Sequence, residues 1–338
     1  MGLIMVVGGQ LGSEAKGKVT DYMYELNQAV ATVRVGGPNS GHTAYTKSGE
    51  KVVTRCLPVT AWRKDSVSII APGSYIDISV LFDEIRKFNM TPDNLFIDKH
   101  AVVLRPNADE EEIGKGLRET IASTCTGTGQ GVLQRVSRSA KTIFAQNVLD
   151  LHSYVCDTRE IIDSMLRCGH NVIVEGTQGY GLSNLHTDDY PYCTSRDTTA
   201  AGFLAEIGFS PFDVSRVVLC LRTFPIRVGG NSGPMYKEVD WDFVTKHAES
   251  SKPLIEHTTV TNRVRRVGLF DVDMVRKAIR ANKPTDIVMN FCDYLDAACY
   301  GKAKLTIIAD TRLRVIEKAL DRKVDYIGTS PTCLFTRN

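Results

Sequence analysis

Short runs of aliphatic and β-branched residues alternate with amphipathic stretches along the chain. The apolar runs are continuous, as is typical of strands covered on both faces, and the stretches between several of them have the period of a helix. This alternation predicts an α/β fold with a largely parallel central sheet covered by helices. The predicted strands are 3–7, 31–35, 67–70, 171–174, 216–221, 285–289 and 304–308, and the predicted helices are 80–88, 161–168, 271–281 and 312–320.

No repeat, linker or low-complexity segment interrupts the 338 residues, so we expect a single domain spanning residues 1–338. The net charge of +2, without a dense basic block, argues against a nucleic-acid polymer as a partner. No apolar run is long enough to span a membrane, and the N-terminal run lacks the basic start of an export signal. The odd number of cysteines, nine, without a C-x-x-C pair, suits a reducing, cytoplasmic location.

The first glycine-rich loop follows the first predicted strand, and residues 8–19 read GGQLGSEAKGKV. Glycines let the backbone approach a phosphate, and the N-terminus of the next helix offers free N–H groups. The stretch from Gly12 to Lys18 fits G-x-x-x-x-G-K, but Val19 replaces the hydroxyl residue that holds magnesium in a P-loop. We therefore expect a different kind of phosphate loop, with Lys16 and Lys18 as charge partners; the alternative is a plain glycine turn.

A second polar loop, residues 36–43 with the sequence GGPNSGHT, follows the predicted strand 31–35. A single histidine is often structural or merely exposed. His42 lies in a loop too polar to belong to a core, which makes it a candidate for charge stabilisation or proton transfer.

Six segments, in order, resemble motifs of the adenylosuccinate synthetase family. Residues 9–18 resemble the family's first loop, G-x-Q-W-G-D-E-G-K-G-K, and residues 36–43 resemble its G-G-x-N-A-G-H-T loop. The other four are VEGTQG at 174–179, YPYCTS with DTTA at 190–200, FPIRVG at 224–229 and the basic stretch TVTNRVRR at 259–266. Alone, the basic stretch would be interpreted as a solvated surface; the order of the motifs favours an aspartate-binding loop.

In this family a nucleoside triphosphate phosphorylates the 6-oxygen of a purine monophosphate, and the amine of L-aspartate then displaces that phosphate. The resemblance implies a C–N ligase with Mg²⁺ as cofactor, and a homodimer, because Arg138 matches an arginine that reaches the neighbouring subunit's substrate. It implies catalytic roles for Ser13, Lys16, His42 and Gln178, and Mg²⁺ ligands at Ser13 and Gly41.

The resemblance also implies three groups of binding residues. The purine monophosphate would be bound by Ser13, Glu14, Asn39, Thr124, Arg138, Gln178, Thr194 and Arg263. Aspartate would be bound by Thr261, Arg263 and Arg265, since arginine forks suit carboxylates. The triphosphate would be bound by Gly12, Ala15, Lys16, Gly17, Lys18, Gly41, His42, Thr43, Arg265, Asn290, Asp293, Ser330 and Pro331.

The chain departs from the family at Ser13, where the family has the aspartate that removes the N1 proton of inosinate. A serine hydroxyl is a poor base, which indicates either a degenerate enzyme or a different substrate. A guanine needs room and an acceptor for its 2-amino group, and serine offers both. A phage-borne branch, the aminoadenylosuccinate synthetases, carries this change and acts on dGMP. We favour dGMP, in the host cytoplasm if the chain is phage-encoded; the alternatives are an IMP-using synthetase and a non-catalytic nucleotide-binding regulatory protein.

A second departure concerns the phosphate donor. The family recognises the guanine of GTP with a K-x-D segment, and Phe291 replaces that lysine, whereas Asp293 is retained. In the turn at 328–331, Ser330 replaces a glycine. A side chain where the family presents bare backbone should change base selection, so we expect ATP as donor, with GTP as the alternative.

Overall fold

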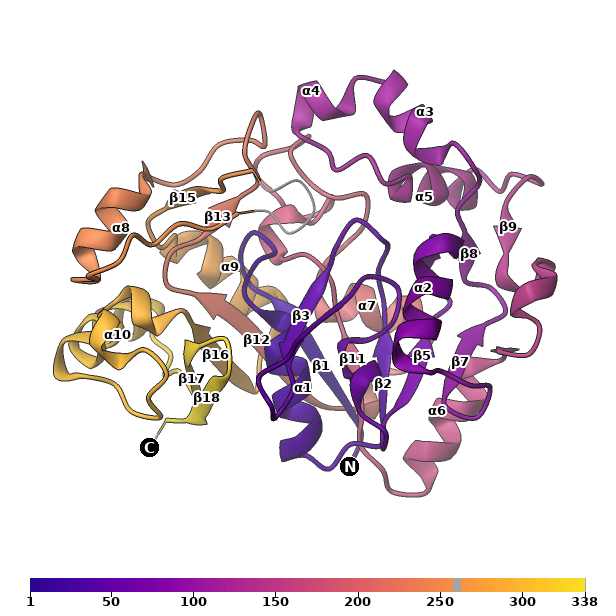
Figure 1. Cartoon of the computed structure of the whole chain (residues 1–338), viewed down its shortest axis with the longest axis horizontal. Helices are drawn as coiled ribbons and strands as arrows, with labels where there is room; N and C mark the ends of the chain where they lie inside the picture. The colour runs from indigo at the N-terminus through magenta and orange to yellow at the C-terminus, as the bar shows by residue number, and fades with distance from the viewer. Residues whose placement is uncertain (258–262, 338) are drawn as a thin grey trace.

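The computed structural model describes residues 1–257 and 263–337 and contains one large central sheet (Figure 1). Ten strands form it, and neighbours run parallel except at one edge, where β17 and β18 are antiparallel. The predicted α/β class with a largely parallel sheet is therefore confirmed. In spatial order the strands are β10 (Val155–Cys156), β7 (Leu95–Asp98), β5 (Val67–Ile70), β2 (Ala31–Arg34), β11 (Val172–Glu175), β1 (Leu3–Gly8), β12 (Val214–Arg222), β16 (Asp286–Asn290), β17 (Tyr326–Ser330) and β18 (Cys333–Thr336).

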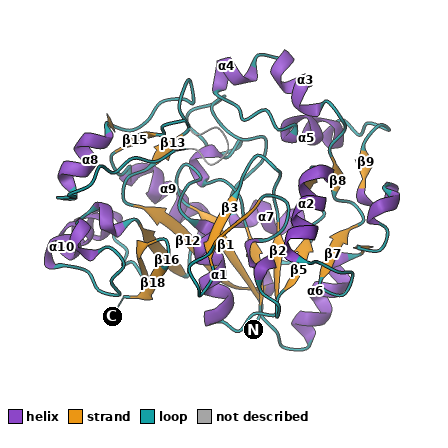
Figure 2. Ribbon diagram, viewed as in Figure 1, coloured by secondary structure: helices purple, strands orange, loops and turns teal. Residues whose placement is uncertain are grey.

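Helices cover both faces of this sheet (Figure 2). The central strand β1 sends Leu3, Met5 and Val7 into one core and Ile4 and Val6 into another, as the two-residue period of a strand requires. The larger core is completed by α6 (Thr158–Arg167), α7 (Ala200–Ile207), α9 (Val272–Asn282) and α10 (Ile307–Leu320), and the opposite core by α1 (Lys16–Leu26).

Smaller elements surround the sheet. Helix α2 (Ile78–Phe88) buries Leu81 and Ile85 against β5 and β7 in a third core. Helices α3 (Ala108–Gly114), α4 (Leu117–Ile121) and α5 (Thr128–Val136) lie together at the top of Figure 1, and α8 (Trp241–His247) lies beside the β13–β15 sheet. The remaining strands are β3 (His42–Tyr45), β4 (Lys51–Thr54), β6 (Tyr75–Ile76), β8 (Val102–Val103), β9 (Ile143–Phe144), β13 (Ile226–Arg227), β14 (Glu238–Val239) and β15 (Arg266–Gly268).

Six of the seven predicted strands and all four predicted helices are present, with ends shifted by a few residues. The strand predicted at 304–308 is wrong, because α10 begins at Ile307. Thr306 caps this helix by accepting a hydrogen bond from the Ala309 N–H at 3.1 Å, and Asp310 lies in the first turn. The β-branched pair at 307–308 suggested a strand, but Ile307 is exposed. Within the described residues, no helix is long and apolar enough to cross a membrane.

The parallel strands place their carboxyl ends along one edge of the sheet. Each of the central strands closes on a residue that is glycine or a buried polar side chain. These residues are Arg34 in β2, Glu175 in β11, Gly8 in β1, Arg222 in β12, Asn290 in β16 and Ser330 in β17. In open α/β sheets this edge is where ligands bind, so the fold itself points to the site.

Gly17 provides the first test, because α1 and β3 meet there. A Cβ at Gly17 would lie 2.6 Å from the Thr43 carbonyl oxygen and 2.8 Å from the Thr43 nitrogen. Backbone cannot retreat as a side chain can, so we expect Gly17→Ala to lower the free energy of unfolding by about 1–3 kcal/mol. Urea denaturation measures this.

Gly114→Ala is the matched control, since a Cβ there meets nothing within 4 Å. That helical substitution should leave stability unchanged or raise it slightly. Equal effects of the two substitutions would contradict a close contact between α1 and β3.

Candidate active site

The first loop is organised around the buried carboxylate of Glu14. Its Oε1 accepts hydrogen bonds from the N–H groups of Gln10 and Gly12, at 3.1 and 2.7 Å. Its Oε2 accepts from Lys16 Nζ at 2.9 Å, and Lys16 also donates to the Gly12 carbonyl at 3.0 Å. A buried ion pair is tolerated only when its hydrogen bonds are satisfied, and here the loop backbone satisfies them. The Glu14 carboxylate therefore holds the loop backbone and Lys16 in place.

The loop then enters α1 through a left-handed residue. Ala15 has φ 59° and ψ 39°, a conformation in which a side chain is disfavoured and where the family motif has glycine. Helix α1 begins at Lys16, so the first N–H groups of the helix lie beside the loop. Gly17 brings the backbone of Thr43 against this helix start. The two loops predicted to bind the triphosphate are thus adjacent.

His42 lies in a buried cluster with Arg34 and Glu175. His42 Nδ1 lies 2.6 Å from Glu175 Oε1, and Glu175 Oε2 accepts from the Val59 N–H at 3.1 Å. Arg34 Nη1 lies 2.9 Å from His42 Nδ1 and 3.3 Å from Nε2, and Arg34 Nη2 donates to the Ser40 carbonyl at 2.9 Å. The Glu175 carboxylate therefore fixes the orientation of the His42 imidazole.

The surroundings keep His42 neutral. Burial, and next the cation of Arg34, lower the pKa of His42 to about 4, although Glu175 opposes this shift. Burial favours protonation of Glu175, but His42 and Arg34 outweigh it and hold the pKa of that carboxyl below its usual value. The 2.6 Å contact then places the imidazole proton on Nδ1, which leaves Nε2 as an acceptor.

Ser13 is held at both its main chain and its side chain. Arg265 Nη1 donates to Ser13 Oγ at 2.7 Å, and Arg222 Nη1 donates to the Ser13 carbonyl at 3.0 Å. The predicted aspartate-binding arginine and the predicted acceptor-binding serine are therefore in direct contact. The Ser13 hydroxyl carries no negative charge, so this hydrogen bond leaves the positive charge of Arg265 unneutralised.

The predicted donor-base residues gather at the ends of β16 and β17. Lys18 Nζ donates to the Ser330 carbonyl at 3.0 Å, and Asn290 Nδ2 donates to the Glu14 carbonyl at 2.8 Å, which links this group to the first loop. Burial lowers the pKa of Lys18 to about 8 and raises the pKa of Asp293 to about 7. Within the described part of the chain, Asn290 Oδ1 is buried without a hydrogen-bond partner.

The other predicted residues have fewer contacts with this cluster or are exposed. Gln178 faces the first loop, because a Cβ on Gly12 would lie 3.1 Å from Gln178 Oε1. Asn39 and Thr194 are half-buried, and Thr194 donates its N–H to the Leu182 carbonyl at 2.8 Å. Thr261 lies outside the described residues. The exposed members of the predicted set are Gly41, Thr124, Arg138, Arg263 and Pro331.

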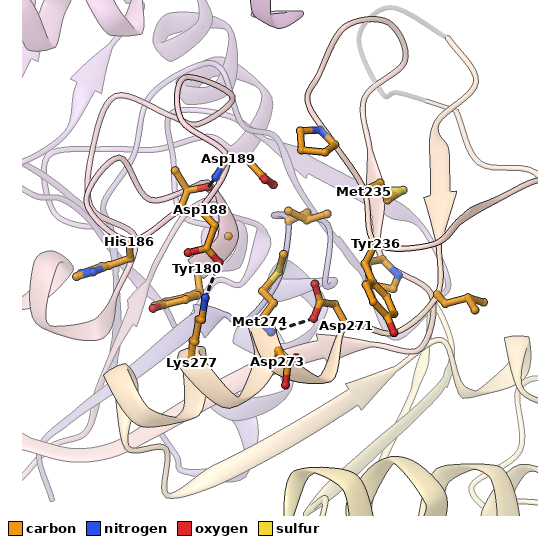
Figure 3. A pocket seen from close by; sticks show the side chains of 16 residues that line it. Tyr180, His186, Asp188, Asp189, Met235, Tyr236, Asp271, Asp273, Met274 and Lys277 are labelled. Carbon is orange, nitrogen blue, oxygen red and sulfur yellow. Dashed lines mark hydrogen bonds and ion pairs between the residues drawn. The ribbon is translucent and has the colours of Figure 1, made fainter.

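A cavity of about 290 Å³ lies beside this region but is not the predicted site (Figure 3). Leu11 is the only member of the first loop in its lining, and none of the predicted residues that the structure describes lines it. Its walls carry the ion pair of Lys277 with Asp188, at 2.5 Å, and the stacked rings of Tyr180 and His186. The cluster at the ends of the strands therefore remains the candidate active site.

Four residues of this cluster do not appear in the set predicted from sequence: Arg34, Glu175, Arg222 and Glu256. Arg222 and Glu256 form an ion pair, and Arg34 and Glu175 hold His42. For Arg34, Glu175 and Arg222, the signal that could have identified them is a charged residue that ends an apolar run, since such a residue is buried at the site edge of the sheet. Glu256 is half-buried in a segment outside the sheet, and no such signal marks it.

The residues predicted to hold Mg²⁺ fit it in part. Magnesium in nucleotide enzymes is bound by phosphate oxygens with one or two protein ligands. The exposed Gly41 backbone can supply a carbonyl, whereas Ser13 Oγ is neutral and faces the Arg265 guanidinium. Among the described residues, no group of three or more His, Cys, Asp or Glu side chains could hold a metal. A metal here would thus rely on the phosphates.

Comparison with known proteins identifies the class of this site. The family model described as adenylosuccinate synthetase matches residues 5–150 and 142–302. The adenylosuccinate synthetase of Methanococcus vannielii is 33% identical over 335 residues, covering 97% of this chain and 96% of the relative. That of Methanocaldococcus jannaschii is 35% identical, covering 97% of this chain and 94% of the relative. The protein is a nucleotide-dependent enzyme that forms a C–N bond. It belongs to the adenylosuccinate synthetase family.

Two solved structures are similar to the whole chain. Succinoaminodeoxyadenylate synthetase (PurZ) of cyanophage S-2L, bound to dGMP and to dATP as an energy donor, is 28% identical, with a TM-score of 0.83, and the match covers 99% of this chain and 95% of that one. Fully ligated adenylosuccinate synthetase from Plasmodium falciparum is 20% identical, with a TM-score of 0.86 and full coverage of both chains, and it supports the fold alone.

The lowered pKa of His42 predicts a loss of stability in mild acid. Below pH 6.5 the histidine of the unfolded chain takes up a proton that the folded chain binds only near pH 4, so stability falls as the pH falls through this window. Between pH 7 and pH 5 the loss assigned to this one residue is about 2 kcal/mol. Urea denaturation at both pH values measures the total loss.

His42→Gln removes the titration, so its loss between the two pH values should be smaller by that amount. His170→Gln, at an exposed histidine, should retain the dependence of the unsubstituted protein. If the His42→Gln protein and the unsubstituted protein lose equal stability, the neutral histidine is disproved.

Proposed function

We propose that this protein joins L-aspartate to C6 of dGMP with hydrolysis of ATP, giving N6-succino-2-amino-2′-deoxyadenylate for the synthesis of DNA that contains 2-aminoadenine. The observation that carries the proposal is Ser13, in a family site that retains Lys16 and His42. The likeness to the cyanophage enzyme, whose structure holds dGMP and dATP, supports it. The curated relatives are named adenylosuccinate synthetases, so IMP with GTP is the alternative.

The reaction has two steps. The 6-oxygen of the purine attacks the γ-phosphorus of the donor, the bond from that phosphorus to the bridging oxygen breaks, and the N1 proton is lost. The aspartate amine then forms a bond to C6, inorganic phosphate leaves with the 6-oxygen, and the amine loses a proton. Positioning and charge stabilisation supply most of the catalysis in phosphoryl transfer.

Ser13 discriminates between purines through its hydroxyl. One lone pair of Oγ accepts from Arg265, so a second lone pair and the hydroxyl proton remain for the substrate. The second lone pair suits the 2-amino group of guanine, which hypoxanthine lacks. An aspartate at this position would be larger, and its carboxylate would form an ion pair with Arg265. The N1 proton is then taken by a group other than a carboxylate at residue 13, such as a water, a substrate phosphate or a relay through Ser13.

Asp293 can accommodate adenine in the donor, and residue 291 lacks the lysine with which the family motif recognises guanine. A carboxylate accepts from N1–H and the 2-amino group of guanine, whereas a protonated carboxyl donates to N1 of adenine and accepts from its 6-amino group. Because burial raises the pKa of Asp293 to about 7, both forms exist near neutral pH. Phe291 has no ammonium to donate to the 6-oxygen of a guanine.

The remaining residues stabilise the triphosphate and the transferred phosphoryl group. Backbone N–H groups of the first loop, with Lys16 and Lys18, provide fixed positive charge for the phosphates. Mg²⁺, held by phosphate oxygens and the Gly41 carbonyl, would neutralise the charge that develops on them. His42 has its proton on the side of Glu175, so it must gain a second proton to donate to a phosphate. We further propose a homodimer in which the exposed Arg138 serves the partner subunit's site.

The purine preference is tested by phosphate release with aspartate, ATP and Mg²⁺, with dGMP or IMP as acceptor. We expect turnover with dGMP and little with IMP. Ser13→Asp should reverse this preference, because the carboxylate restores a base for N1 and removes the partner of the 2-amino group. We expect kcat/KM for dGMP to fall by about ten- to a hundredfold.

Ser13→Ala is the control for size, because it keeps the space and removes the acceptor. It should lower kcat/KM for dGMP and leave the weak reaction with IMP unchanged. Turnover of the unsubstituted protein with IMP alone would refute the proposal in favour of the purine-pathway reaction. Nucleotide binding without any turnover would instead establish the regulatory alternative.

A further inference from the structure

Arg222 joins the first loop to the rest of the site. It is the last residue of β12, and it is 1% exposed. Its Nε donates to the Phe224 carbonyl at 2.6 Å, its Nη1 donates to the Ser13 carbonyl at 3.0 Å, and its Nη2 pairs with the Glu256 carboxylate. The Gln10 side chain binds both backbone polar groups of Arg222: its Oε1 accepts from the Arg222 N–H at 2.8 Å, and its Nε2 donates to the Arg222 carbonyl at 3.1 Å. One buried guanidinium thus ties three segments that are distant in sequence.

Glu256 extends this connection to Arg265. Its Oε1 accepts from the Tyr294 hydroxyl at 3.0 Å, and its backbone carbonyl accepts from the Arg265 N–H at 2.9 Å. The Arg265 guanidinium returns to Ser13 Oγ at 2.7 Å. The contacts close a ring from Ser13 through Arg222, Glu256 and Arg265 back to Ser13.

Phe291 covers the open face of this guanidinium. Its ring centroid lies 3.9 Å from Arg222 Cζ, the closest cation–π contact among the described residues. A lysine at this position, as in the family motif, would put a second cation beside the buried Arg222. The aromatic ring therefore suits the arginine that it covers.

We propose that Arg222 is a positioning residue that holds Ser13 and Arg265 in register, and that Phe291 supports Arg222 instead of contacting the base of the donor. The inference rests on the proposed function only in that Ser13 faces the acceptor purine and Arg265 faces aspartate. A substitution at residue 291 then acts on the aspartate side of the reaction, although the sequence places that residue in the donor-base segment.

Phe291→Leu tests this separation, because leucine keeps an apolar side chain and removes the π face. We expect kcat/KM for aspartate to fall by about three- to thirtyfold, as the loss of a partly desolvated cation–π contact predicts, with the KM of ATP unchanged within about twofold. The measurement is steady-state phosphate release with whichever monophosphate the unsubstituted enzyme accepts, so that an error about dGMP leaves the test intact. Phe209→Leu, at another half-buried phenylalanine on the same core, should change neither constant.

Arg222 is tested by comparing lysine with glutamine at this position. Lysine keeps the charge for Glu256 but cannot reach three acceptors, so Arg222→Lys should recover part of the kcat/KM for aspartate that Arg222→Gln loses. A rise in the KM of ATP for Phe291→Leu, with aspartate kinetics unchanged, would overturn the inference by showing that Phe291 serves the donor. Equal aspartate kinetics in the two Arg222 variants, at equal thermal stability, would reduce Arg222 to a purely structural residue.

Discussion

The parallel register of the central strands is the constraint on which the site depends. Because β2, β11, β1, β12, β16 and β17 end along the same edge, their last residues lie there buried from water, and five of the six are polar or charged. Buried charges are tolerated only in pairs, and the pairs found are Arg34 with Glu175 and Arg222 with Glu256. These pairs hold Ser13 of the first loop and His42 of the second loop in place.

The fold class and most of the sheet could be predicted from sequence, because a covered parallel strand is a continuous apolar run with little ambiguity. The strand expected at 304–308 failed because two isoleucines after a threonine cap suit a helix start as well as a strand. Sequence motifs predicted only part of the site. Motifs located Ser13, His42 and Arg265, but the partners that hold them, Glu175 and Arg222, end strands that look like core.

Substitution at one residue of this site has consequences at others. Ser13 changes the charge next to Arg265, and Phe291 changes the charge next to Arg222, while both arginines contact Ser13. An aspartate at residue 13 and a lysine at residue 291 would alter the same small cluster in opposite directions. Residues 13 and 291 therefore share one electrostatic environment, which connects two departures from the family motifs that are far apart in the chain.

The central place of β1 also governs how the chain reaches this structure. Leu3 pairs with Val172 on one side and with Val214 on the other, so both neighbours of β1 in the sheet come from far along the chain. Contacts of such long sequence separation slow folding, since the entropy of the intervening chain is lost before the strand pairing contributes favourable free energy. The first loop, which directly follows β1, therefore acquires its shape only when the second half of the chain has docked.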